Sequence, residues 1–391
     1  MSIKQNSTFM LLQNLVAIPS FVGENADERQ LAEFVYQYLV KFKFLKVQKQ
    51  PIGNSGRFNV IATTPGKPRL FLGGHLDTVP RQEGWQGDPI AGRIEGTRFY
   101  GLGAYDMKGG CAAIMDAISL LQKAEGLFVL FYCDEEYDFA GMKKFLAEYP
   151  EENGIPELAM IAEPSDLEIW NAHRGIVEIH LQMFGKTGHA KNPKEGNNAI
   201  DALYQTIDFL RTEFEEATPH QTLGLTTLNL SSLHGGINKG TDSGGKIKIG
   251  QQGNMIADYA ECVIDIRTNS PDINGKILAA KMVALAQTRF GCRLETKIAH
   301  DFGALYTAPE KIQVVEKAIA TISGKNAQYA DGADKGFGDG QFLQEKFGIP
   351  VVNLGPLGDN AHKPNEWVDI DSLEVTRDIY SAIIQHYCGT P

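Results

Sequence analysis

The sequence contains 391 residues, which is longer than the size at which one hydrophobic core usually stops growing, so we expect two domains. Asp and Glu outnumber Lys and Arg by 48 to 37, and this acidic balance argues against nucleic acid and anionic membranes as partners. The five cysteines are scattered without a C-x-x-C pair, and no stretch is apolar enough to span a membrane, which indicates a reduced, cytosolic protein.

The first part of the chain, residues 1–174, alternates strand-like runs with amphipathic helical stretches. The strands read as continuous apolar runs rather than as alternating ones, which is typical of strands buried on both faces. The pattern therefore predicts an α/β domain with a mostly parallel sheet and helices on both faces. We expect helices over 26–42 and 109–124, and strands over 58–64, 69–75, 127–135 and 158–164.

The pattern changes within residues 175–298. The strands now alternate apolar and polar residues, and the order of elements is β-α-β-β-α-β, which predicts a ferredoxin-like α+β domain with helices on one face of an antiparallel sheet. The glycine-rich stretch 235–254 is expected to be a long hairpin inside this domain. Residues 299–391 return to the first pattern, so we expect a main domain built from 1–174 and 299–391 that the second domain interrupts.

Polar residues follow the buried strands of the main domain. In an open α/β sheet, ligands bind beyond the carboxyl ends of the strands, so these side chains should meet at one edge. Each of them alone has an ordinary explanation as a cap or a surface residue, but so many carboxylates together oppose folding unless cations neutralise them. Histidines with carboxylates suit zinc or another borderline divalent metal. The set comprises His75, Asp77, Asp106, Asp134, Glu135, Glu136, Glu163 and His362.

Motifs along nearly the whole chain carry a resemblance to a known family. The chain resembles the dinuclear zinc amidohydrolases and exopeptidases, which include acetylornithine deacetylase, succinyl-diaminopimelate desuccinylase and the carboxypeptidases of the G type. Within that family it is most similar to the acetylornithine deacetylases, in "FYGLGAYDMKGG", "LTTLNLSSLHGG" and "VIDIRTNSP". The family motifs are "GGHLDTVP", "WQGDPIAGRIEGTRFYGLGAYDMKGG", "DEE", "AEPS", "GKTGHAKNP" and "AHKPNEW".

The resemblance implies a ligand set for two divalent metal ions, zinc first, with cobalt or manganese also possible. Asp106 would bridge the two ions. His75 and Glu163 would complete one site, and Glu136 and His362 the other. Asp77 would orient His75 by accepting the N–H of its other ring nitrogen.

The resemblance also implies the catalytic and substrate-binding residues. Glu135 would be the general base that takes a proton from a metal-bound water and passes it to the leaving amine. The inserted domain would serve for dimerisation and as a lid, with His189 reaching the partner's metal centre to stabilise the oxyanion. Asn254 and Arg267 would hold the substrate carboxylate.

We therefore expect a cytosolic, homodimeric, metal-dependent hydrolase that removes the N-acyl group from an amino acid such as N-acetylornithine. Two alternatives lie within the family: a desuccinylase-like deacylase, and an exopeptidase that removes a terminal residue from a di- or tripeptide. A third, from another class, is a catalytically silent binding protein. That protein should have lost a metal ligand or Glu135, and all of them are present.

Overall fold

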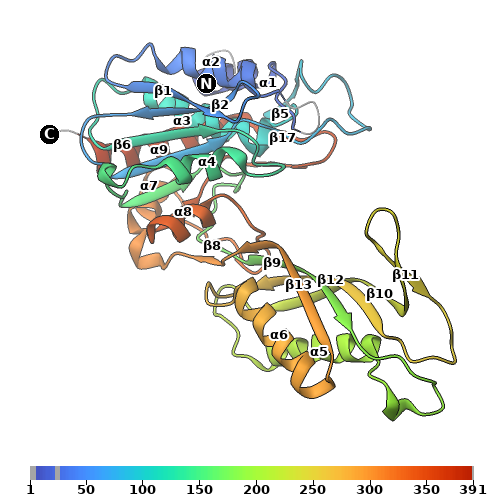
Figure 1. Cartoon of the computed structure of the whole chain (residues 1–391). Coiled ribbons are helices and arrows are strands. Elements are labelled where there is room, and N and C mark those ends of the chain that lie inside the picture. Colours follow the sequence, from blue (N-terminus) through green and yellow to red (C-terminus); the bar gives the residue numbers. More distant parts are fainter. Residues whose placement is uncertain (1–5, 23–26, 390–391) are drawn as a thin grey trace. The chain divides into compact units, whose positions relative to one another are not determined.

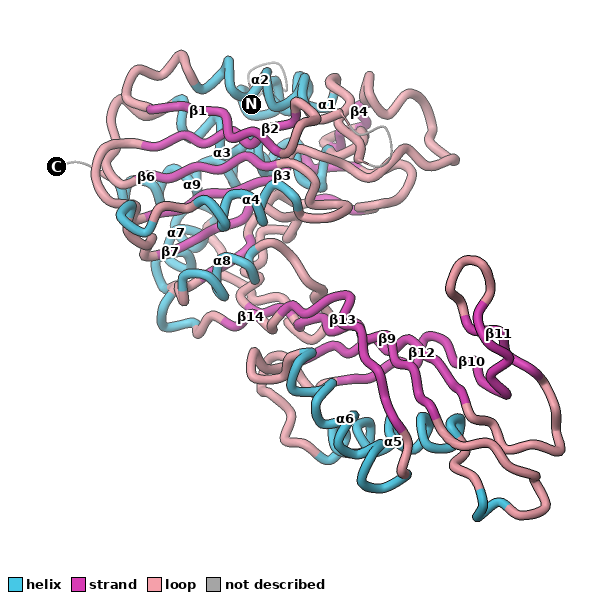
Figure 2. The backbone as a smooth tube through the Cα atoms, viewed as in Figure 1, coloured by secondary structure: helices cyan, strands magenta, loops and turns pink. Residues whose placement is uncertain are grey.

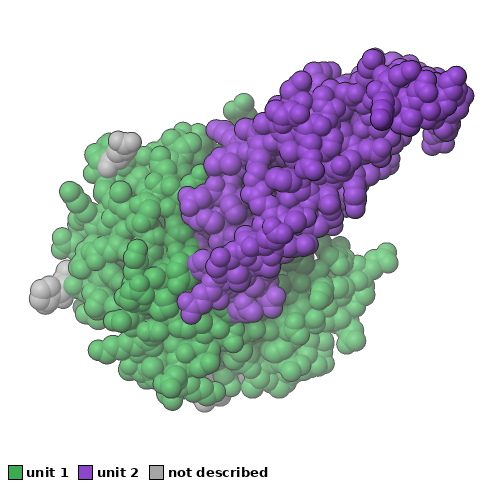
Figure 3. All heavy atoms as spheres, turned by 90° about the horizontal axis from the view of Figure 1, so that it is seen from below, with its two compact units in different colours: residues 1–171, 306–330, 338–391 green, residues 172–305, 331–337 purple. Residues whose placement is uncertain are grey.

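The computed structural model describes residues 6–22 and 27–389, which form two compact units (Figure 3). Unit 1 comprises the chain up to residue 171 together with 306–330 and from 338 onward. Unit 2 comprises 172–305 and also 331–337, a segment that the sequence analysis assigned to the main domain. Among the described residues, no helix is both long and apolar enough to cross a bilayer.

Unit 1 is built on a six-stranded mixed sheet (Figure 1). The four strands β6, β3, β7 and β15 run parallel, while β2 pairs antiparallel with both β6 and β1. The predicted mostly parallel sheet is therefore confirmed, with an antiparallel hairpin at one edge. In spatial order the strands are β1 (Lys46–Ile52), β2 (Arg57–Thr63), β6 (Leu127–Tyr132), β3 (Leu70–His75), β7 (Leu158–Ile161) and β15 (Val351–Asn353).

Helices cover both faces of this sheet, as predicted (Figure 2). On one face, α4 (Ala140–Glu148) packs with α8 (Gly340–Phe347), and Phe145 of α4 lies 5.7 Å from Phe71 and 5.5 Å from Phe128 between ring centroids. Continuous apolar strands are buried because both of their faces are covered in this way. The remaining helices are α1 (Ser7–Val16), α2 (Arg29–Leu39), α3 (Gly109–Ser119), α7 (Gln313–Ser323) and α9 (Ile370–Cys388), of which α3 packs against α1 and α9.

Close packing of α3 fixes the segment that precedes it. A Cβ atom at Gly110 would lie 2.1 Å from the carbonyl oxygen of Ala162, directly after β7. A Cβ atom at Gly74 in β3 would lie 2.6 Å from Sγ of Cys111. Only glycine allows so close an approach. The first turn of α3 is therefore held against the carboxyl ends of β3 and β7.

A second, four-stranded sheet in unit 1 connects distant parts of the chain. Its strand β17 (Trp367–Asp369) pairs with β5 (Arg98–Tyr100), so the segment around His362 is fixed beside the segment that leads into Asp106. The other two strands are β4 (Arg93–Glu95) and β16 (Gly358–Asp359). A separate two-stranded sheet, outside this one, consists of β8 (Ala172–His173) and β14 (Leu305–Tyr306).

Unit 2 has the predicted ferredoxin-like arrangement. Its antiparallel sheet has the spatial order β11-β10-β12-β9-β13, and the apolar residues of β9, at every second position, pack with α5 and α6 in one core. The stretch 235–254 contains the end of β10, a turn and β11, as the hairpin prediction required. The elements are β9 (Gly175–Phe184), α5 (Ala199–Glu216), β10 (Thr227–Thr241), β11 (Ile247–Gly250), β12 (Tyr259–Thr268), α6 (Gly275–Phe290) and β13 (Arg293–Phe302).

Candidate metal centre

The Asp106 carboxylate lies between two histidines in unit 1. It lies in the turn Ala104–Lys108, which leads into α3, and its own backbone is extended, with φ −114° and ψ 96°. One carboxylate oxygen lies 3.2 Å from Nε2 of His75, the last residue of β3, and the other lies 3.2 Å from Nε2 of His362. A carboxylate whose two oxygens face two separate imidazoles has the geometry of a bridging metal ligand.

Two glutamates complete two groups of ligand atoms around Asp106. His75, Asp106 and Glu163 form one group, and Asp106, Glu136 and His362 form the other, with ligand atoms within 4.8 Å of one another in each. Glu163 follows β7, and its buried Oε1 atom has no hydrogen-bond partner among the described residues. Glu136 follows β6 and lies 2.9 Å from Nε2 of His362. Imidazole and carboxylate are donors that suit a divalent ion such as zinc.

The electrostatics of this cluster also fit a cation. Burial raises the pKa of Glu135 well above its ordinary value, and burial raises the pKa of Glu163 to about 8, because carboxylates without counter-charges resist ionisation in a dry site. Hydrogen bonds with Asp106 and Glu136 raise the pKa of His362 to about 10. Divalent cations would reverse this balance and keep the carboxylates charged.

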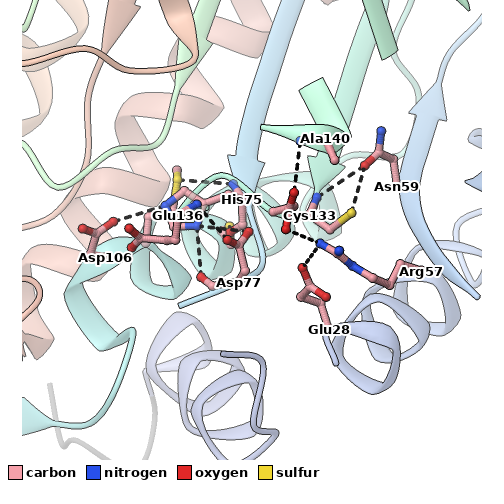
Figure 4. Close-up of polar contacts among 12 residues, drawn as sticks. Glu28, Arg57, Asn59, His75, Asp77, Asp106, Cys133, Glu136 and Ala140 are labelled. Atoms are coloured by element: carbon pink, nitrogen blue, oxygen red, sulfur yellow. Dashed lines mark hydrogen bonds and ion pairs between the residues drawn. The ribbon is translucent and has the colours of Figure 1, made fainter. Parts of the chain in front are cut away.

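Asp77 lies within the cluster, but its contact with His75 differs from the prediction. Nδ1 of His75 lies 3.0 Å from the backbone carbonyl oxygen of Asp77, and 3.8 Å from its carboxylate. The carboxylate instead accepts a hydrogen bond from the backbone N–H of Glu136 at 2.9 Å (Figure 4). The backbone oxygen of Asp77 is therefore the nearer partner of the ring, and the orienting role of the Asp77 carboxylate stays a prediction.

Glu366 is a buried residue that the sequence analysis quoted in "AHKPNEW" without giving it a role. Its carboxylate accepts hydrogen bonds from the backbone N–H groups of Gly103, Tyr105 and Asp106, at 2.8, 2.8 and 2.9 Å. Burial raises the pKa of Glu366 to about 8. Three such contacts fix the turn that presents Asp106 to both histidines.

Asp339 is a second residue that the sequence analysis missed. It lies at the start of α8 and is fully buried. Burial raises its pKa to about 7. Because Asp339 follows no strand, the rule that located the other acidic residues could not find it.

The predicted residues of unit 2 fall into two places. His189 and Asn254 lie side by side, because His189 pairs with Met255 and the N–H of Ala190 donates to the carbonyl oxygen of Asn254 at 2.9 Å. Arg267 lies near the other end of β12, where its Nε donates to Asp265 at 2.8 Å. At about 3.4 Å per residue, the strand from Tyr259 to Arg267 spans roughly 27 Å. The structure therefore does not bring Asn254 and Arg267 together within one chain.

Comparison with known proteins identifies the family. Residues 71–386 match the Peptidase family M20/M25/M40. The chain belongs to this family. M20 membership makes the protein a metal-dependent hydrolase of amide bonds, in agreement with the ligand groups around Asp106.

Named relatives of this M20 protein match over nearly their full length. The acetylornithine deacetylase of Photorhabdus laumondii is 29% identical over 408 residues, covering 99% of each chain, and that of Pasteurella multocida is 29% identical over 402 residues, covering 98% of each. Aminopeptidase PepT from Bacillus cereus has a similar structure, with a TM-score of 0.73 at 20% identity over 98% of each chain. The Bacillus subtilis YXEP protein, a dinuclear metal binding peptidase of the M20 family, has a TM-score of 0.66 at 17% identity over 96% of each chain.

Proposed function

We propose that this M20 protein is a dinuclear amidohydrolase that removes the N-acyl group from an amino acid, with N-acetylornithine as the first candidate substrate. The observation that supports it most is the Asp106 carboxylate, with one oxygen facing His75 and the other facing His362. The full-length similarity to two acetylornithine deacetylases supports the choice of substrate. The five buried, free cysteines are consistent with a cytoplasmic location.

Two divalent ions, zinc first and cobalt or manganese as alternatives, fit the donor set. His75 and Glu163 would hold one ion and Glu136 and His362 the other, with Asp106 shared between them. When bound, the ions would polarise the scissile carbonyl and lower the pKa of the attacking water.

Glu135 is the residue that we assign to proton transfer. It is partly buried within the cluster, and ligand-type atoms of His75 and Glu136 lie within 4.8 Å of its carboxylate. It would accept a proton from the attacking water and deliver that proton to the leaving amine. We assign its neighbour Glu136 to metal binding, because the Glu136 carboxylate lies 2.9 Å from Nε2 of His362.

The positions of His189, Asn254 and Arg267 support a homodimer in which substrate-binding residues come from both chains. Because Asn254 and Arg267 lie at opposite ends of β12, one substrate carboxylate can contact both only if the two residues come from different subunits. His189 lies beside Asn254 and would then act from the same subunit as Asn254, on the oxyanion. The exposed edges of the unit 2 sheet, β11 and β13, are available for pairing with a second copy.

Mixing two inactive variants tests the action of His189 across subunits. His189→Ala and Glu135→Gln should each be inactive alone, but in a mixed dimer one active site recovers both intact groups. Up to about half of the mixed dimer's sites can be restored in this way. Activity should therefore rise after subunit exchange. The fraction of mixed dimer is measured by mass spectrometry of the intact dimers. Absence of recovery in a fully exchanged mixture would place His189 in its own chain's site or outside catalysis.

Arg267 should determine the preference for a free carboxylate. Its side chain is 40% exposed, so its pairing with Asp265 leaves it able to contact a ligand. Loss of a charge-assisted pair in Arg267→Ala should reduce kcat/KM roughly 30- to 1,000-fold. The test compares an N-acyl amino acid with its methyl ester, and the variant should lose most of the preference for the acid. If the variant discriminates as strongly as wild type, Arg267 has only a structural role.

A substrate panel tests the proposed function as a whole. The metal-loaded protein is incubated with N-acetyl- and N-succinyl-amino acids and with di- and tripeptides, and released amine is measured. We expect the highest kcat/KM for an N-acetyl amino acid. A higher value for peptides would favour the exopeptidase, and hydrolysis of none would favour the silent binding protein.

A further inference from the structure

We infer that Arg57 and Asn59 of strand β2 form a clamp that positions the segment bearing Glu135 and Glu136. This segment, residues 133–141, consists of the loop after β6 and the first two residues of α4, and is called the carboxylate loop below. The inference rests on the proposed function for the roles of the two glutamates, but the contacts that support it stand by themselves (Figure 4). Neither Arg57 nor Asn59 belongs to the ligand groups around Asp106, so both are positioning residues.

The carboxylate loop is a tight turn with a backbone conformation that needs support. Asp134 and Phe139 have positive φ angles of 68° and 56°, which residues other than glycine adopt rarely and at a cost in energy. The N–H of Phe139 donates to the carbonyl oxygen of Asp134, and that of Gly141 to Cys133, at 2.6 and 3.1 Å. Because Glu135 and Glu136 directly follow Asp134, any relaxation there would displace both carboxylates.

Arg57 holds Asp134 by an ion pair that lies outside the ligand groups around Asp106. A single guanidinium nitrogen, Nη2, lies 2.7 Å from a carboxylate oxygen of Asp134 and 2.7 Å from one of Glu28. Both acidic side chains are almost completely buried, so this cation neutralises charge that water cannot reach. The second oxygen of Asp134 accepts from the N–H of Ala140 at 3.3 Å. Asp134 therefore turns away from the metal cluster, contrary to the prediction that it joins the other acidic residues.

Asn59 connects the two ends of the carboxylate loop. It is fully buried, its Nδ2 donates to the carbonyl oxygen of Gly141 at 2.8 Å, and its Oδ1 accepts from the N–H of Cys133 at 3.3 Å. A Cβ atom at Gly141 would lie 2.4 Å from the oxygen of Cys133 and 2.7 Å from Oδ1 of Asn59. The two ends therefore meet without free space, with the Asn59 amide between them.

The loop is thus held from two directions. Towards the metal cluster, Asp77 accepts from the N–H of Glu136. On the side of β2, Arg57 and Asn59 fix the residues that precede and follow the two glutamates. Loss of the clamp should leave the fold in place and loosen the positions of Glu135 and Glu136, because Arg57 and Asn59 contact the loop through groups outside the ligand set.

The experiment removes the clamp while keeping the buried charge constant. Arg57→Met combined with Glu28→Gln leaves a net charge of −1 in the cluster of Glu28, Arg57 and Asp134, as in wild type. We expect kcat to fall about 10- to 100-fold, the usual cost of losing a residue that orients metal ligands, with KM little changed. Amide exchange within 133–141, followed by mass spectrometry, should accelerate. Arg57→Lys should recover most of kcat, because one nitrogen makes both contacts.

Controls separate the outcomes. Arg69→Met removes an exposed arginine that pairs with Glu157 and should change neither kcat nor exchange. If the double variant does not fold, Asn59→Asp replaces it, since it keeps an acceptor for Cys133 but loses the donor to Gly141. The clamp is overturned if the double variant has the kcat of wild type and its amide exchange within 133–141 is unchanged. The same outcome in Asn59→Asp overturns it where that variant is used instead. If the wild-type protein hydrolyses no substrate, the proposed function is contradicted. In that case the rate of amide exchange within the carboxylate loop is the test of the clamp.

Discussion

Asp106→Ala should lose both metal ions at once, whereas His362→Ala should lose only one. In the structure Asp106 is the residue that the two ligand groups share, with one oxygen towards His75 and one towards His362. Alanine at position 106 leaves two ligands in each of these groups and removes the carboxylate that joins them, so neither ion is held firmly. Removal of His362 leaves the group of His75, Asp106 and Glu163 complete.

Metal analysis of the two purified variants after dialysis checks this expectation. Wild type should retain two ions per chain, His362→Ala one, and Asp106→Ala close to none. Circular dichroism should show that both variants are folded. Retention of two ions in Asp106→Ala would contradict the bridging role.

Glu135→Gln should abolish most turnover without loss of metal. Glutamine preserves the size of the side chain but cannot accept a proton, so the proton transfer that we assign to Glu135 is lost. General acid-base catalysis typically contributes at least about 10²-fold, and kcat should fall by that factor or more. Glu136→Gln is the matched control, since it should lower the affinity for one ion. Near-normal turnover in Glu135→Gln would show that another group activates the water.

The sequence was sufficient to predict most of unit 1. The continuous apolar runs of β3 and β6 indicated strands covered on both faces, and the acidic and histidine residues after them indicated a metal site. This worked because parallel strands align their carboxyl ends, so residues that follow them in the sequence meet in space. His75, Glu136 and Glu163, which this rule selected, lie in the groups of ligand-type side chains around Asp106.

The residues that support the site were harder to predict, because their contacts depend on tertiary packing. Glu366 lies more than 250 positions from the turn that it holds, and nothing in its local sequence marks those backbone contacts. Arg57 is the first residue of β2, and from the sequence alone it would be taken for a surface charge, because its contacts with Glu28 and Asp134 form only in the folded chain. In unit 2 the spacing of Asn254 and Arg267 suggested a shared ligand, but an extended strand separates them.

The most direct test of the central claim is reconstitution of metal-free protein. The protein is stripped with a chelator, titrated with zinc or cobalt, and assayed for hydrolysis of N-acetylornithine and of the other N-acyl amino acids of the panel, while bound metal is measured in parallel. We predict no turnover without metal, and turnover that rises to its maximum as bound metal approaches two ions per chain. Full turnover by the stripped protein, or a fully loaded protein that leaves every N-acyl amino acid intact, would contradict the account.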